Sequence, residues 1–141
     1  GVFTADASGQ GQAFALNQDF SLNGNPSQNP RAKPESRGRA IVVYATGQGA
    51  RLLDAATRQL LRLPSGYPAP ANGPLYVTAE TPSVTIGGVE AQVVFSGLAP
   101  GFVGLWQMNV VIPANAPAGN AVPLVVATAD GISRTTTIAV N

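Results

Sequence analysis

Apolar and polar residues alternate along most of the second half of the chain, which is the pattern of half-buried β-strands. Val84 and Ile86 share one face of a short run that ends at Gly87 and Gly88. The residues that share one face of the next run are Val89, Ala91, Val93 and Phe95. Two period-2 runs joined by two glycines predict a β-hairpin, because tight hairpin turns need positive φ angles. We therefore interpret Gly87 and Gly88 as structural turn residues.

Two further stretches extend this series of strands. In LWQMNVVIP, the residues predicted to point inward are Trp106, Met108, Val110 and Ile112. The closing stretch VPLVVATADGISRTTTIAV is predicted to form two strands around a turn at Asp130 and Gly131, where the Asp130 carboxylate is expected to cap backbone N–H groups. Short strands separated by regular turns predict an all-β fold, and specifically a single antiparallel immunoglobulin-like β-sandwich.

The first half of the chain is less regular. Phe14 and Leu16 fall on one face of a predicted strand, and Ala13 and Ala15 fall on the other. The sequence RAIVVYATG, residues 39–47, predicts a strand that is buried on both faces, because its apolar residues do not alternate with polar ones.

Residues 51–63 permit two structures. One helical face would carry Leu52, Leu53, Ala56, Leu60 and Leu63. The halves RLLDA and QLLRL fit equally well a hairpin that turns at Ala56-Thr57-Arg58, and we favour this strand pairing. Proline and glycine between Pro64 and Pro74 predict a surface loop. Residues 51–82 are therefore expected to be an irregular insertion or long loop within one domain of residues 1–141.

Charge and hydropathy limit the classes of partner. Charged residues make up 11% of the 141 residues, and the formal net charge is +1. The densest basic stretch, RAKPESRGR at residues 31–39, is interrupted by Pro34 and Glu35 and is predicted to be a solvated loop. We expect no nucleic-acid partner, since phosphate binding needs clustered Lys and Arg. No apolar run approaches the roughly 18 residues of a transmembrane helix, so no membrane insertion is expected.

The residue types present exclude most kinds of catalytic and metal-binding site. The chain has no Cys and no His, which excludes Ser-His-Asp triads, Cys nucleophiles and thiolate or histidine metal sites. The Gly47-x-Gly49 sequence after a hydrophobic strand is similar to the start of a dinucleotide-binding fold. Leu52, however, takes the third glycine position, and no acidic residue follows at the required spacing. We therefore expect no enzyme and no cofactor.

Two further candidate sites involve oxygen ligands and the lysine. Asp6, Asn17, Asp19 and Asn23 carry oxygens that suit calcium, but Asx turns explain them equally well, and we favour the turns. Secreted sandwiches sometimes carry a Lys–Asn or Lys–Asp isopeptide crosslink, but Lys33, the single lysine, is predicted to lie in a loop beside Pro34. We therefore expect neither a metal site nor such a crosslink.

Aromatic side chains offer a route to binding. Tyr67 and Tyr76 flank the Pro/Gly-rich loop, where exposed rings would contact a sugar or a protein partner. Simple packing over the loop is the interpretation that we favour for both. Trp106 alternates with inward residues and is expected in the core.

The second half of the chain resembles a known family. VTIGGVEAQVVFSG, followed by MNVVIPANAPAGNAVPLVVATADGISRTTTIAV, is similar to IPT/TIG-type immunoglobulin-like domains. With FTADASGQGQAFALNQDFSLN and IVVYATGQG, the chain resembles a C-terminal domain of large secreted proteins of soil acidobacteria over residues 1–49 and 83–141. The resemblance implies an extracellular, non-catalytic sandwich and transfers no catalytic residue. Because the chain begins at Gly1 rather than Met, we also expect either a secreted product whose leader has been removed or an excised domain.

These observations predict an extracellular or cell-surface structural or adhesive module that contacts other copies of itself or other surface proteins. One alternative is a filament subunit, in which residues 1–18 add a strand to the sheet of a neighbour. We favour pairing of this segment within its own chain. A second alternative is a carbohydrate-binding module in which Tyr67 and Tyr76 contact a polysaccharide.

Overall fold

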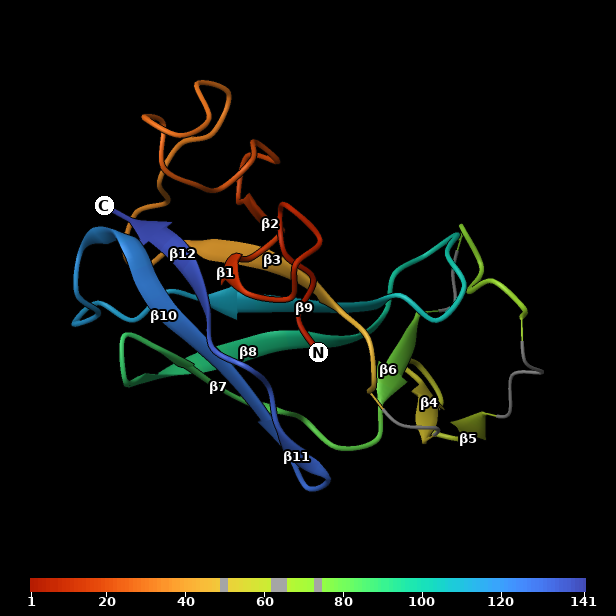
Figure 1. The fold of residues 1–141 in the computed structure, drawn as a ribbon. Helices are drawn as coiled ribbons and strands as arrows, with labels where there is room; N and C mark the ends of the chain where they lie inside the picture. The colour runs from red at the N-terminus through yellow and green to blue at the C-terminus, as the bar shows by residue number, and fades with distance from the viewer. Residues whose placement is uncertain (49–50, 62–65, 73–74) are drawn as a thin grey trace.

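The computed structural model describes residues 1–48, 51–61, 66–72 and 75–141, and across them the chain forms twelve strands and no helix (Figure 1). The predicted all-β class is therefore confirmed. The strands are β1 (Gly11–Gln12), β2 (Ala15–Asn17), β3 (Ala40–Ala45), β4 (Leu52–Asp54), β5 (Leu60–Leu61), β6 (Tyr76–Thr78), β7 (Ser83–Ile86), β8 (Val89–Leu98), β9 (Trp106–Val111), β10 (Gly119–Thr128), β11 (Gly131–Ile132) and β12 (Thr136–Val140).

The strands join into one sheet that curls into a half-barrel. One part contains β2, β3, β9 and the second half of β8, in that order, and the other contains β1, β12, β10, β7 and the first half of β8. β8 belongs to both parts, and its pairing with β9 shifts register between Val93 and Phe95. In Figure 1 the blue strands β10 and β12 cross the strands β3, β9 and β8.

The sheet is mixed, not purely antiparallel as predicted. β1 pairs in parallel with β12, where Gly11 lies beside Thr136 and Gln12 beside Thr137. Three residues later, β2 pairs antiparallel with β3. Residues 11–17 therefore pass from the last strand to β3, and this continuous path determines the parallel direction of β1.

The main core lies between the two parts of the sheet. The inward residues predicted on β9 and after it, Trp106, Met108, Val110 and Ile112, are all at most 4% exposed. Ile41, Val43 and Ala45 of β3 also face this core, whereas Val42 and Tyr44 are half-buried on the opposite side of the sheet. The predicted burial of both faces of this strand is therefore wrong in degree, since only one face is fully covered.

Residues 51–61 confirm the hairpin interpretation. Leu52 pairs with Leu61 and Leu53 with Leu60, so β4 and β5 are antiparallel. β6 pairs with β4 and joins the main sheet through Val77, which lies beside Gly97 of β8. The segment predicted to be irregular thus contains three short strands at one end of the molecule, at the right in Figure 1. Gly49, Leu63 and part of the predicted 64–74 loop lie outside the described residues.

Candidate functional site

The predicted turn residues lie between strands. Gly87 and Gly88 connect β7 to β8 with φ angles of 60° and 79°, in the left-handed region that favours glycine. Asp130 lies in the turn between β10 and β11, and Gly131 is the first residue of β11. The cap expected from the Asp130 carboxylate is not among the hydrogen bonds of the described residues; instead the Thr128 hydroxyl donates to the Gly131 carbonyl at 3.4 Å.

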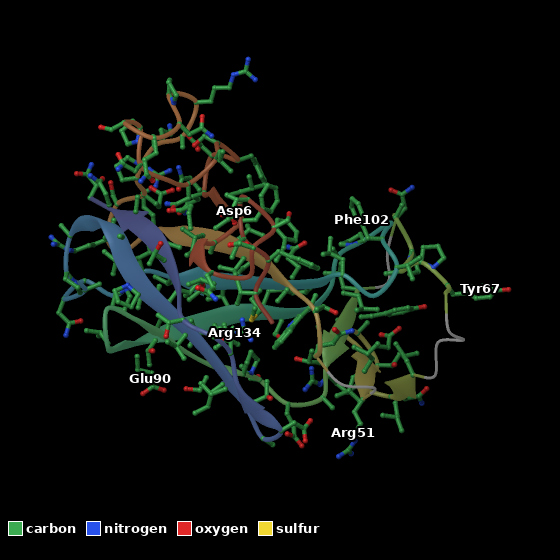
Figure 2. All side chains as sticks on the ribbon, viewed as in Figure 1. Asp6, Arg51, Tyr67, Glu90, Phe102 and Arg134 are labelled. Atoms are coloured by element: carbon green, nitrogen blue, oxygen red, sulfur yellow. The ribbon has the colours of Figure 1, made fainter. Side chains whose placement is uncertain are left out.

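The two predicted contact tyrosines have different environments. Tyr67 is 64% exposed and projects outward from the β4–β6 end of the molecule, as does Phe102 (Figure 2). Tyr76 is half-buried and packs against a small cluster of Leu52, Ala69 and Leu98. Within the described residues no ring contact joins the two tyrosines, so they do not form a common stacking platform.

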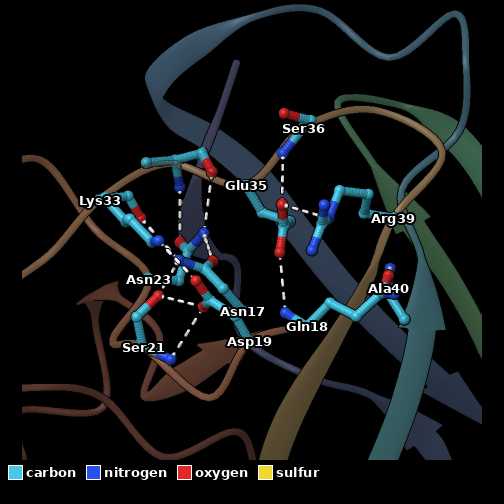
Figure 3. Close-up of polar contacts among 11 residues, drawn as sticks. Asn17, Gln18, Asp19, Ser21, Asn23, Lys33, Glu35, Ser36, Arg39 and Ala40 are labelled. Carbon is cyan, nitrogen blue, oxygen red and sulfur yellow. Dashed lines mark hydrogen bonds and ion pairs between the residues drawn. The ribbon is translucent and has the colours of Figure 1, made fainter.

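A buried amide network occupies the region where calcium ligands were considered (Figure 3). The Asn23 side chain donates to the carbonyl of Ala139 at 2.9 Å and accepts from its N–H at 2.8 Å. It also donates to Oδ1 of Asn17 at 2.8 Å, and Asn17 in turn donates to the Ser21 hydroxyl and the Lys33 carbonyl. The amide oxygens of Asn17 and Asn23 are therefore already used as hydrogen-bond acceptors that join the 17–33 loop to β12.

Asp19 and Lys33 form an ion pair at the edge of this network. Lys33 Nζ lies 2.5 Å from Asp19 Oδ2, and both side chains are about half exposed. The Lys33 ammonium, helped by hydrogen bonds from Ser21, holds the pKa of Asp19 well below its usual range. Amide condensation needs a neutral amine and a protonated carboxyl, so this solvated and ionised pair does not favour the crosslink considered for Lys33.

The basic 31–39 stretch is not simply a solvated loop, because Glu35 within it is only 6% exposed. Its carboxylate accepts from the backbone N–H groups of Gln18 and Ser36 at 2.7 and 2.8 Å, and Arg39 Nε lies 3.1 Å away. The Glu35 backbone also pairs in parallel with Val140. Burial of a paired carboxylate fixes this stretch to the sheet, a role that its sequence did not indicate.

A hollow of about 500 Å³ opens at the end of the half-barrel near Gly1. Val2, Thr46, Trp106 and Thr128 contribute to its wall, and Arg134 lies on its border. The indole N–H of Trp106 already donates to the Ser96 hydroxyl at 2.9 Å, so the ring is a wall rather than a free donor. Its ionisable groups are the Asp130 and Arg134 side chains and the N-terminal ammonium of Gly1, which donates to the Thr46 carbonyl at 2.6 Å.

The outer side of β2, β3, β9 and β8 carries an apolar surface that the sequence pattern did not reveal. We call it the outer aromatic face. Its main residues are Phe3, Phe14, Leu16, Val42, Tyr44 and Val111. Phe3 and Phe14 are 44% and 40% exposed, and the rings of Phe14 and Tyr44 lie 5.8 Å apart. In the sequence, this surface is indicated by residues 39–47, which are apolar on both faces of the strand. The same pattern predicted a strand buried on both faces.

Among the described residues, no group of three or more acidic side chains could hold a metal ion, and no helix is long and apolar enough to cross a membrane. Comparisons of the chain with protein families, curated proteins and solved structures found no match.

Proposed function

We propose that this chain is an extracellular or cell-surface, non-catalytic immunoglobulin-like module that acts through protein–protein contacts. The outer aromatic face is the observation that carries the proposal. It places six apolar side chains on one side of the sheet, of which Phe3 and Phe14 are exposed and the other four are half-buried. Extended apolar patches on soluble domains are typical of interaction surfaces.

The strand order supports the immunoglobulin-like part of the proposal. β2, β3, β9 and β8 follow the order A-B-E-D, and β7, β10 and β12 follow C-F-G, as in constant-type immunoglobulin domains. The Gly87-Gly88 turn then joins strand C to strand D, which keeps the two sheets continuous. In this arrangement β4, β5 and β6 are an insertion between strands B and C.

The extracellular location rests on the resemblance of the sequence to domains of secreted proteins. Antibody labelling of intact, unpermeabilised source cells and of their medium tests it. Surface or medium label supports export, whereas label found only after cell lysis would contradict it.

Contact through the outer aromatic face is tested by site-specific photo-crosslinking in the source culture. A photoreactive residue replaces Tyr44 on this face or, as a control, Val125, which points outward from the opposite part of the sheet. We expect protein adducts from position 44 and few from position 125. If position 44 gives no adduct, the proposed function fails.

A filament built by strand addition is less well supported. The N-terminal segment is already paired within its own chain: Val2 with Ala45, β1 with β12, and β2 with β3. Ala13 and Ala15 are fully buried in the core. Donation to a neighbour would therefore require this segment first to leave its own sheet.

Carbohydrate binding through Tyr67 and Tyr76 is also less well supported, because the Tyr76 ring is used in packing. Titration of polysaccharides against the intrinsic fluorescence tests it, with Tyr67→Ala as the informative variant. A saturable change that Tyr67→Ala removes would favour this alternative.

A further inference from the structure

The outer aromatic face is built from rows of side chains that lie directly across four strands. Leu16 pairs with Val42, Val42 with Asn109, and Asn109 with Phe95. The next row brings Tyr44 beside Gln107, with the Phe14 ring tilted by 43° against the Tyr44 ring. Cross-strand neighbours of this kind form a continuous surface.

The strand segments of this face carry no charged side chain. β2, β3, β9 and the part of β8 from residue 92 onward contain no Asp, Glu, Lys or Arg. The polar side chains in its middle rows, Gln107 and Asn109, hydrogen-bond to each other at 3.0 Å. Burial of this face by a partner therefore removes no charged side chain from water, and the Gln107 and Asn109 side chains keep their mutual hydrogen bond. The opposite part of the sheet instead carries Glu90, which is exposed on β8.

We propose that the outer aromatic face binds the same face of a second copy of this chain, around a two-fold axis. The inference rests on the proposed function and names its partner. In such an isologous contact the whole face meets its own copy, so a net charge on the face would meet a like net charge. A face without charges avoids this repulsion, whereas a charged partner would leave its own groups desolvated and unpaired.

The dimensions of the face indicate a weak dimer. Four strands spaced by about 4.8 Å, over about six residues of about 3.3 Å each, cover roughly 400 Å² on each copy. The pair would bury roughly 800 Å² in total, below the roughly 1,200 Å² of stable complexes. The dimer is therefore expected to be weak and to form only at high protein concentration.

Sedimentation velocity of the purified chain, from about 10 µM to about 1 mM, tests this inference, since the range spans the weak affinity expected of a small interface. We expect the average mass to rise from monomer toward dimer with concentration. Val42→Glu, at the centre of the face, should keep the protein monomeric, whereas Val125→Glu on the opposite part of the sheet should not. Circular dichroism verifies that both variants are folded, and Val111→Glu replaces Val42→Glu if the latter unfolds.

A wild-type chain that stays monomeric throughout the series overturns the inference. So does association that Val42→Glu leaves intact, or that Val125→Glu abolishes equally. Photo-crosslinking from position 44 to other proteins, with a monomeric purified chain, would overturn the second-copy partner while leaving the proposed function standing.

Discussion

At Gly97 the backbone carbonyl of Tyr76 occupies the space that a side chain would need. A Cβ built at this position comes within 2.2 Å of the Tyr76 oxygen and 3.0 Å of the Val77 Cα, both in β6. We expect Gly97→Ala to reduce the free energy of unfolding by about 1–3 kcal/mol, because β6 must move away from β8. Urea denaturation of the purified variant measures this loss.

Gly88→Asn is the matched control for Gly97→Ala. Gly88 has a φ of 79° with nothing within 4 Å of its Cβ position, and Asn tolerates this conformation better than most residues. Its loss should be smaller than that of Gly97→Ala. Equal losses would show that the contact with Tyr76 is not what requires glycine at position 97.

Asn23 is the residue whose side chain joins most partners in the 17–33 loop. It is 1% exposed, and its amide satisfies both the N–H and the carbonyl of Ala139. Asn23→Ala should lower the free energy of unfolding by about 2–4 kcal/mol, because it leaves buried backbone groups without partners. Asn120→Ala, at an exposed position on β10, should change it little. Similar effects for the two variants would contradict the proposed role of the network.

The Asp19–Lys33 pair predicts a dependence of stability on pH. The pKa of Asp19 is lowered from an ordinary value of 3.8, so its contribution is present above that value and is lost as the pH falls below it. Because both side chains are about half exposed, the contribution is small. Denaturation from about pH 6 to about pH 2 should show wild type losing its advantage over Asp19→Asn as carboxylates protonate. Lys33→Gln should behave like Asp19→Asn, and a pH-independent difference would rule out the ion pair.

Among the elements, β4, β5 and β6 form a small unit at one end of the sheet. They have a separate small cluster around Leu52, Ala69 and Leu98. β6 is joined to β8 by the ladder pair Val77 and Gly97 and by hydrogen bonds between Thr78 and Ser96. Amides of this part should exchange with solvent faster than those of β3, β9 and β10, since it can open without unfolding the main core. Hydrogen exchange followed by mass spectrometry measures this. Equal protection of both parts would contradict separate opening.

The two tyrosines provide a mutational counterpart. Tyr76→Ala should accelerate exchange in β4–β6 because the ring packs on the small cluster, whereas Tyr67→Ala should leave exchange unchanged because Tyr67 is 64% exposed. An effect of Tyr67→Ala alone would reverse the roles assigned to the two rings.

Alternation in the sequence predicted the strands best where one face is buried and the other is polar. β9 is such a case, because Trp106, Met108 and Val110 alternate with Gln107 and Asn109. β3 lacks that contrast, since Val42 and Tyr44 are apolar on the exposed side, so periodicity could not distinguish a covered strand from one with an apolar outer face. The Asn23 contact with Ala139 joins residues 116 positions apart, and no local pattern encodes such a pair.

For the whole molecule, the central question is whether the N-terminal segment pairs with the sheet of its own chain or with the sheet of a neighbouring chain. Residues 11–17 connect β12 to β3, and the fully buried Ala13 and Ala15 fill the core between them. Seven residues, 11–17, therefore pair with a strand in each of the two parts of the sheet. A swapped segment would make the same pairings between two chains.

Because the chain has no cysteine, a single engineered pair can distinguish the two arrangements. Gln12 and Thr137 are direct neighbours on β1 and β12, so Gln12→Cys with Thr137→Cys should form a disulfide on oxidation. Pairing within one chain predicts a monomer on a non-reducing gel with faster migration than its reduced form, at all protein concentrations. A ladder of covalent oligomers would mean that the segment pairs with a neighbouring chain. In that case the buried surface of Ala13 and Ala15 would belong to an assembly contact, and a filament would become the better account of this protein.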